Sequence, residues 1–209
     1  MIRSLSVVIL AFWMLGAPAP THAQRLVALL DTSSSLGNAT TSEVNSPKAA
    51  TTSQAYYLVR VLRDVNDQLG MAIEVLPWYE ITHSRFFLVG LAGKEFEAEL
   101  IRQLPEAADS TLLSSALAAI ENEPNCAIYI VLTDGIINER DQPNYQLLIR
   151  SVVATKVLGI FVHPSTSDGR LDELREVVTS PNYVVSELSA DNVIKFILTR
   201  LSHAGACLV

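Results

Sequence analysis

The chain has 209 residues, of which 49% are hydrophobic, so it can bury the core of one sizeable domain but is too short for two. This apolar content argues against global disorder. The formal net charge of −7 argues against nucleic acid as a partner, because proteins that bind nucleic acid favour a basic face.

The N-terminal segment has the pattern of an export signal. One basic residue, Arg3, precedes an apolar run over about 5–15, and small residues and prolines lead to Ala23. The run is short for a membrane span. The pattern therefore predicts a signal peptide over residues 1–23 and an exported domain over 24–209, secreted or periplasmic, with no stable membrane insertion after cleavage. An uncleaved N-terminal anchor is the alternative.

The mature chain alternates between strand-like and helix-like segments. The first strand is expected over 25–31, where the apolar character is continuous, as in a parallel sheet covered on both faces. A polar loop follows, and a helix over about 48–69 ends at Gly70. Pro77 lies in the second strand and suits an edge or a strand end. Later strands are expected over 84–90, 126–135, 157–164 and 183–188, and later helices over 94–104, 112–122, 145–156, 169–180 and 190–201.

This order of elements predicts one doubly wound α/β domain with a mostly parallel central sheet and helices on both faces. The strand over 126–135 is the most apolar and is expected near the centre of the sheet. The short connection between the second and third strands predicts a hairpin, which adds one antiparallel edge strand.

Polar residues follow the first and the central strands. In an open, mostly parallel sheet, ligands bind beyond the carboxyl ends of the strands. Asp31 and Asp134 are expected there, with Ser33 and Ser35 spaced by two after Asp31, so that all three point the same way in a locally extended segment. Thr111, at the start of a helix, is expected at the same edge. Two carboxylates and three hydroxyls suit Mg²⁺. Asp and Ser are also common in turns and helix caps, which is the alternative interpretation.

Together, Asp-x-Ser-x-Ser at 31–35, Thr111 and Thr-Asp-Gly at 133–135 resemble the von Willebrand factor type A (VWA) domain. That family carries a metal-ion-dependent adhesion site built from these five side chains. The resemblance extends over essentially the whole mature chain. It implies that Asp31, Ser33, Ser35, Thr111 and Asp134 hold a divalent ion: Mg²⁺, with Mn²⁺ or Ca²⁺ as alternatives. Ser34 stands where glycine is common, and Asp109 and Ser110 are competing ligands.

The resemblance further implies a secreted adhesion module, not an enzyme, in which the bound ion captures an Asp or Glu carboxylate of a partner protein. The first alternative is a structural module that keeps the fold without using the metal. The second is a Mg²⁺-dependent hydrolase. Such an enzyme would have an Asp-x-Asp motif after the first strand, and Ser33 occupies the position of its second acid, which argues against this alternative. The motifs Gly-x-Ser-x-Gly, Gly-x-Gly-x-x-Gly and a phosphate-loop lysine are missing from the sequence.

Three further features are predicted with their alternatives. Cys126 and Cys207 are expected to meet at the far end of the sheet and form a disulfide, as the export compartment allows, or else to remain free. Asn38 begins a glycosylation sequon, for which an unused site is preferred. Trp78 and Tyr79 are expected to pack, with a partner contact as the alternative. The four histidines (His22, His83, His163 and His203) are isolated in sequence and are not expected to bind a metal.

Overall fold

The computed structural model describes residues 25–40, 44, 53–108, 110–123, 127–166 and 168–201. The predicted signal peptide, Cys126 and Cys207 lie outside the described residues, so the cleavage site and the disulfide stay predictions. Within the described ranges, none of the helices is both long enough and apolar enough to cross a membrane.

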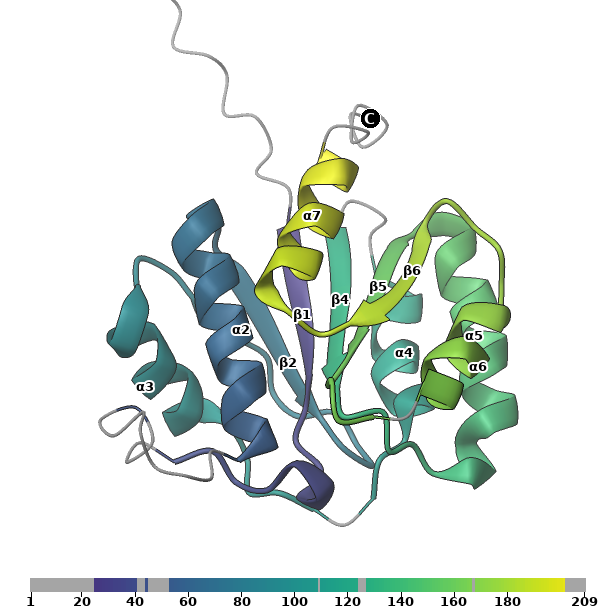
Figure 1. Cartoon of the computed structure of the whole chain (residues 1–209), viewed down its shortest axis with the longest axis horizontal. Helices are drawn as coiled ribbons and strands as arrows, with labels where there is room; N and C mark the ends of the chain where they lie inside the picture. The colour runs from purple at the N-terminus through teal and green to yellow at the C-terminus, as the bar shows by residue number, and fades with distance from the viewer. Residues whose placement is uncertain are drawn as a thin grey trace, which may run out of the picture.

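Strands and helices alternate along the chain close to their expected places (Figure 1). The strands are β1 (Arg25–Asp31), β2 (Ile73–Trp78), β3 (Phe86–Leu88), β4 (Ala127–Thr133), β5 (Val157–Val162) and β6 (Tyr183–Glu187). The helices are α2 (Gln54–Leu69), α3 (Gly93–Gln103), α4 (Leu113–Glu121), α5 (Gln142–Thr155), α6 (Asp168–Glu176) and α7 (Ala190–Leu201), with short 3₁₀ turns η1 (Ser34–Leu36) and η2 (Glu139–Asp141).

The strands form one six-stranded sheet in the order β3-β2-β1-β4-β5-β6. All neighbours pair in parallel except β2 and β3, so β3 is the expected antiparallel edge strand. The two central strands, β1 and β4, end at the same edge of the sheet. This topology confirms the predicted doubly wound α/β fold.

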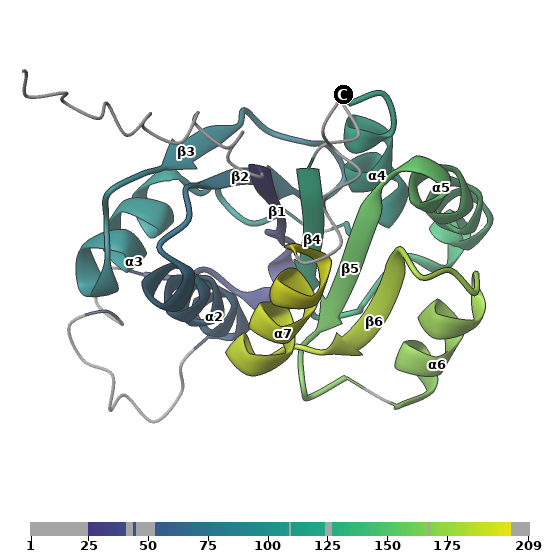
Figure 2. The ribbon, with the colours of Figure 1, turned by 90° about the horizontal axis from the view of Figure 1, so that it is seen from above.

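Helices lie on both faces of the sheet (Figure 2), and an apolar cluster fills the space on each face. Alternate residues of β1 divide between them, because side chains along a strand point to opposite faces. Leu26, Ala28 and Leu30 pack with residues of α2, α3 and α7. Val27 and Leu29 pack with residues of α4, α5 and α6. Burial on both faces explains the continuous apolar run of β1.

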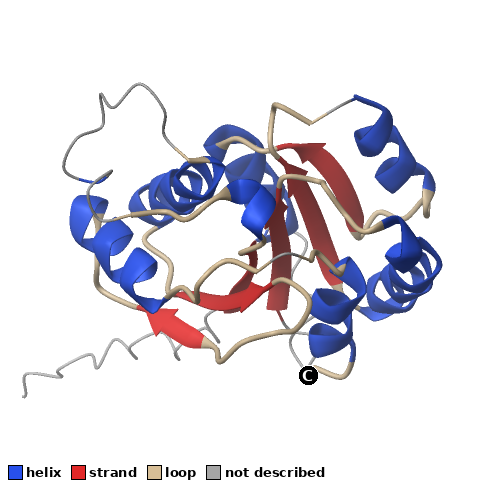
Figure 3. Cartoon of the chain, turned by 90° about the horizontal axis from the view of Figure 1, so that it is seen from below, coloured by secondary structure: helices blue, strands red, loops and turns tan. Residues whose placement is uncertain are grey.

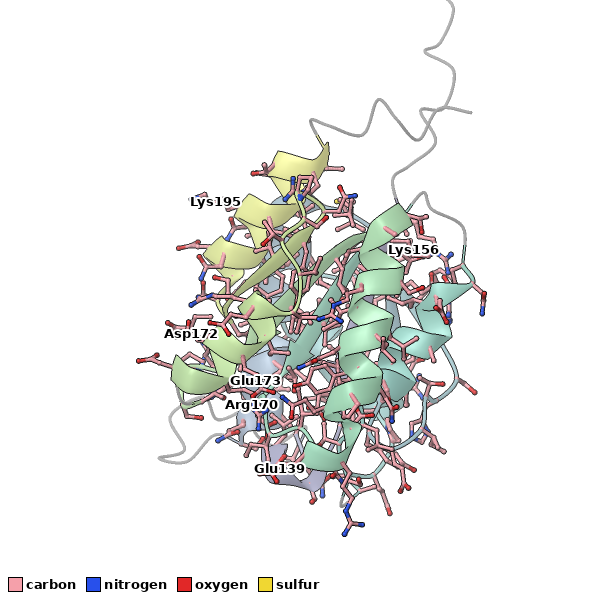
Figure 4. The ribbon with its side chains drawn as sticks, turned by 90° about the vertical axis from the view of Figure 1, so that its right-hand side faces the viewer. Glu139, Lys156, Arg170, Asp172, Glu173 and Lys195 are labelled. Carbon is pink, nitrogen blue, oxygen red and sulfur yellow. The ribbon has the colours of Figure 1, made fainter. Side chains whose placement is uncertain are left out.

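Polar contacts fix the helices at their ends and sides. The Ser53 hydroxyl accepts a hydrogen bond from Tyr56 N at 3.1 Å and caps α2, which ends at Gly70 in the left-handed conformation. On α6, the Arg170 guanidinium lies 2.6 Å from a Glu173 carboxylate oxygen (Figure 4). The Tyr145 hydroxyl donates to the same carboxylate at 2.5 Å, which ties α5 to α6.

The second strand corrects one expectation about Pro77. β2 lies between β1 and β3, so the edge-strand interpretation is wrong. Pairing with β3 stops at Val75, and Pro77 lies beyond it near the end of β2. The missing N–H of Pro77 therefore costs no hydrogen bond to β3. The neighbouring Trp78 is fully buried, so it packs in the core as expected.

Candidate metal centre

Two buried aspartates follow neighbouring strands at the carboxyl-end edge of the sheet, which Figure 3 shows from below. β1 and β4 pair in register through Leu30 and Leu132. Asp31, the last residue of β1, and Asp134, directly after β4, therefore come to the same edge. Their exposed fractions are 2% and 1%. The structure brings these two predicted site residues together.

The Asp31 carboxylate accepts two hydrogen bonds. The Thr133 hydroxyl donates to Oδ2 at 2.6 Å, and Ser33 N donates to Oδ1 at 2.9 Å. Burial raises the pKa of Asp31 to about 7, and the charge of Asp134 adds to the rise, although the hydrogen bonds from Thr133 and Ser33 oppose it. Within the described residues, these hydrogen bonds therefore do not fully compensate a negative charge on Asp31.

The Asp134 carboxylate has one oxygen bonded and one without a partner. Ile136 N donates to Oδ1 at 2.9 Å, whereas Oδ2 is buried and has no hydrogen-bond partner within the described residues. The following turn requires Gly135, whose φ is 77° and whose added Cβ would lie 2.6 Å from Val162 Cγ1. The Thr166 hydroxyl donates to the Asp134 carbonyl and holds the turn from the β5 side.

Ser33 and Ser35 lie together, but not through the expected extended segment. The chain turns into η1 directly after Ser33, so the extended conformation predicted through residue 35 is wrong. Buried Leu36 anchors this turn, and Ser34 N donates to Ala108 O at 2.7 Å. The turn nevertheless brings the Ser33 and Ser35 hydroxyl oxygens to 3.0 Å from each other.

Thr111 reaches the same edge through its backbone. Its carbonyl accepts from Asn138 N at 3.1 Å, and Leu112 N donates to Tyr79 O at 3.0 Å. Thr111 is 5% exposed. In the described part of the chain, no hydrogen bond joins its hydroxyl to the other four predicted ligands. Asp109, one of the competing ligands, lies outside the described residues.

Two residues that support the site were not predicted from sequence. Thr133 donates to Asp31, although the sequence marks it only as the first residue of Thr-Asp-Gly. Asp141 is 2% exposed, and its carboxylate accepts hydrogen bonds from Ser114 N, at 2.9 Å, and from the Ser114 hydroxyl. Asp141 therefore fixes the first turn of α4, next to Thr111. Thr133 was recognisable as a hydroxyl at a strand end, whereas a carboxylate 27 residues from its partner left no local signal.

His163 also lies at this edge, at the end of β5. Its Nδ1 accepts from Ser165 N at 3.2 Å within its own loop. Burial lowers the pKa of His163, although the charge of Asp134 opposes the shift. These contacts agree with the expectation of an ordinary strand-end histidine.

The donor set fits a hard divalent cation. Neither Asp31 nor Asp134 has an ion pair with Lys, Arg or His in the part of the chain that the structure describes. The described residues contain no group of three or more His, Cys, Asp or Glu placed to hold a metal. The candidate ligands are two carboxylates and neighbouring hydroxyls, so all of their donor atoms are oxygens, which Mg²⁺ prefers.

The sequence matches no protein-family model and no curated protein. Solved structures do match its fold. A von Willebrand factor type A protein from Catenulispora acidiphila has a TM-score of 0.51 at 15% identity, over 85% of this chain and 42% of that one. The VWA domain of SpRpn10 has a TM-score of 0.53 at 9% identity, over 85% of this chain and 95% of that one.

A third structure is proximal thread matrix protein 1 from the mussel byssus, whose metal-ion-dependent adhesion site is occupied by zinc. It matches with a TM-score of 0.50 at 18% identity, over 84% of this chain and 44% of that one. The chain thus spans less than half the length of the mussel and Catenulispora chains. Together these matches show that the chain has the fold of VWA domains.

Proposed function

We propose that this chain, with its VWA fold, is a divalent-cation-dependent protein-interaction module. In this proposal the side chains of Asp31, Ser33, Ser35, Thr111 and Asp134 hold Mg²⁺, directly or through water. The ion, when bound, offers a Lewis-acidic position for an Asp or Glu carboxylate of a partner protein.

The observation that carries the proposal is the uncompensated pair of buried aspartates. Asp134 Oδ2 is buried with no hydrogen-bond partner among the described residues, and burial with the Asp134 charge raises the Asp31 pKa to about 7. A buried carboxylate without a cation is unfavourable, because both desolvation and like charge oppose ionisation. A divalent cation bound between the two carboxylates would offset both penalties.

The serine residues adjust how much charge the ion keeps. Neutral hydroxyl ligands such as Ser33 and Ser35, whose oxygens are 3.0 Å apart, do not neutralise a cation as carboxylates do. An ion held by two carboxylates at most keeps positive character toward solvent. This favours an external anionic ligand over a closed structural site.

The ion and the compartment belong to the proposal as well. Mg²⁺ is the first choice, with Mn²⁺ and Ca²⁺ as alternatives, and the zinc-occupied site of the mussel protein adds Zn²⁺ to the ions worth testing. The predicted signal peptide supports a secreted or periplasmic location, and the byssus origin of that protein is consistent with an extracellular one.

Calorimetric titration tests the metal site. We expect the purified chain to bind Mg²⁺ or Mn²⁺, and we expect Asp31→Asn and Asp134→Asn each to lower that affinity at least tenfold. Asp172→Asn, at an exposed aspartate on α6 (Figure 4), is the matched control and should leave the titration unchanged. Heat of binding that is equal in all four proteins would falsify the metal site.

Affinity capture tests the interaction. We expect proteins retained by the immobilised chain in Mg²⁺ to be released by a chelator, and to be missing when Asp31→Asn is used. Metal binding without metal-dependent capture would favour the structural module instead. Turnover of phosphate-ester or peptide substrates that depends on Asp31 would favour the hydrolase, for which the site offers hydroxyls and carboxylates but no motif of a catalytic nucleophile.

A further inference from the structure

A hollow of about 220 Å³ opens beside the candidate metal centre. Its walls come from the end of β1 and the loop after it, from the start of α2, and from the end of α3 with the segment that follows. Of the five proposed ligands, Asp31 lines it, together with the following Thr32, so the hollow borders the metal centre on the Asp31 side. The Asn38 side-chain oxygen accepts from Ala107 N at 3.2 Å and links the two walls.

The lining of this hollow is of two kinds. Leu30, Ile101, Leu104 and Pro105 supply hydrocarbon surface. Glu106 adds an exposed carboxylate. An occupant that matches both surfaces has an aliphatic stem and a positive end, because long basic side chains bury their stems while the charged head stays in water.

Glu106 is available for such a contact. It makes no ion pair or hydrogen bond within the described part of the chain. Exposed Glu80, after β2, and Glu139, in η2, lie at the same edge, and the whole chain has a formal charge of −7. A partner that offered only a carboxylate would therefore approach a surface of its own sign, so charge complementarity favours a partner that also carries a cation.

We infer that the hollow receives a lysine or arginine side chain from the same partner segment that presents its carboxylate to the metal centre. This inference rests on the proposed function, whose ligand it specifies. The stem lies against Ile101 and Leu104, and the cation pairs with Glu106. The partner segment then carries an acidic residue and a basic residue within a few positions of each other.

Peptide binding tests the inference. The probes are glycine-rich peptides with one aspartate, with lysine placed in turn at each of three positions on either side. In matched peptides norleucine replaces lysine and keeps the stem without the charge. Anisotropy is measured on the full chain in Mg²⁺ and in chelator. We expect the best lysine peptide to bind about fivefold more tightly than its norleucine partner, and only in Mg²⁺.

Variants assign the preference to one side chain. Glu106→Gln should abolish the lysine preference, and Glu106→Lys should replace it with a preference for glutamate at the same peptide position. Glu139→Gln, at an exposed acid near the start of α5 and at the lower end of the molecule (Figure 4), is the matched control and should retain the full preference.

The outcomes separate the two proposals. Metal-dependent binding of aspartate peptides with equal or better affinity for norleucine contradicts the lysine or arginine occupant and leaves the proposed function standing. Equal effects of Glu106→Gln and Glu139→Gln do the same, because they indicate only a diffuse surface charge. Failure of every peptide to bind in a Mg²⁺-dependent way contradicts the proposed function and this inference with it.

Discussion

Buried acids at the two ends of the sheet have opposite electrostatic surroundings. At the amino end, Glu74 of β2 is 2% exposed and contacts the guanidinium groups of Arg25 and Arg85, the latter at 3.1 Å. At the carboxyl end, Asp31 and Asp134 are as deeply buried, but neither has an ion pair in the described residues. The single strand β1 carries both arrangements, with Arg25 at its start and Asp31 at its end.

The pKa values express this difference. Burial by itself raises the pKa of Glu74, but the hydrogen bonds from Arg25 and Arg85 outweigh it and lower the pKa below its ordinary value. At Asp31 burial also raises the pKa, and the neighbouring Asp134 raises it further, to about 7. Within the described residues, arginines neutralise the buried acid at the amino end and no basic residue does so at the carboxyl end, which is consistent with the cation site proposed there.

The amino-end cluster, consisting of Arg25, Glu74, Arg85 and Glu123, gives the largest expected effect. Replacing both arginines by alanine leaves Glu74 buried without a cation. We expect the double variant to lose about 3 kcal/mol of unfolding free energy at pH 7, as measured by urea titration.

A third substitution, Glu74→Gln, checks the cause of that loss. Added to the double variant, it should recover part of the lost stability because it removes the unpaired charge. If the double variant is as stable as the parent chain, the arginines do not neutralise Glu74 and the contrast between the two ends disappears.

A substitution at the buried acids of the carboxyl end should change the free energy of unfolding in the opposite direction. In chelator at pH 8, Asp31→Asn removes a buried charge that no described basic residue neutralises. The pKa of Asp31 is about 7 in the folded state, against about 3.9 in the unfolded state. We therefore expect the free energy of unfolding of the variant to be higher by about 2 kcal/mol. This is less than the full pKa shift implies, because asparagine keeps only one acceptor oxygen. Urea unfolding of both proteins measures the difference, and a less stable variant would mean that Asp31 is compensated within the protein.

The pH dependence of that difference sharpens the test. A carboxyl group whose folded pKa is raised supports the folded state at low pH, and that support is lost as pH rises from about 4 through about 7. Asp31→Asn and the parent chain should therefore unfold within about 0.5 kcal/mol of each other at pH 5 and separate as pH rises to 8. Chelator is present throughout. A constant difference across this range would show that ionisation of Asp31 is not its source.

The sequence carried enough local information to predict the sheet. Continuous apolar runs such as β1 and β4, separated by helix-period segments, specify a parallel sheet because each strand must bury two faces. The edge position of β3 followed from the short connection to β2. Pro77 suggested an edge strand because proline cannot donate a hydrogen bond to a neighbouring strand. β2 has a neighbour on each side, but its pairing with β3 ends at Val75, before Pro77, whereas its pairing with β1 continues to Trp78.

From the sequence one could predict that Asp31 and Asp134 share one edge of the sheet and that Ser33 lies near Ser35, but not the contacts that place them. The carboxyl ends of β1 and β4 had to bring Asp31 and Asp134 together once the strands were neighbours. The turn that joins the Ser33 and Ser35 hydroxyls depends on Leu36 entering the core, which is a tertiary effect. The Asp141 contact with Ser114 spans 27 residues and has no local signature.

The smallest effect is expected from acidification at the amino end, where it should run opposite to that of Asp31. The pKa of Glu74 is lowered, so its contribution is present at neutral pH and is lost as pH falls through the folded value. We expect the parent chain to be more stable than Glu74→Gln by about 1 kcal/mol at pH 7 and equal to it near about pH 3, since the arginines are partly exposed and solvent screens the pair. Urea unfolding at both pH values measures this. If the parent chain instead gained stability relative to Glu74→Gln on acidification, Glu74 would behave as Asp31 does, and the assignment of internal compensation to this end of the sheet would be contradicted.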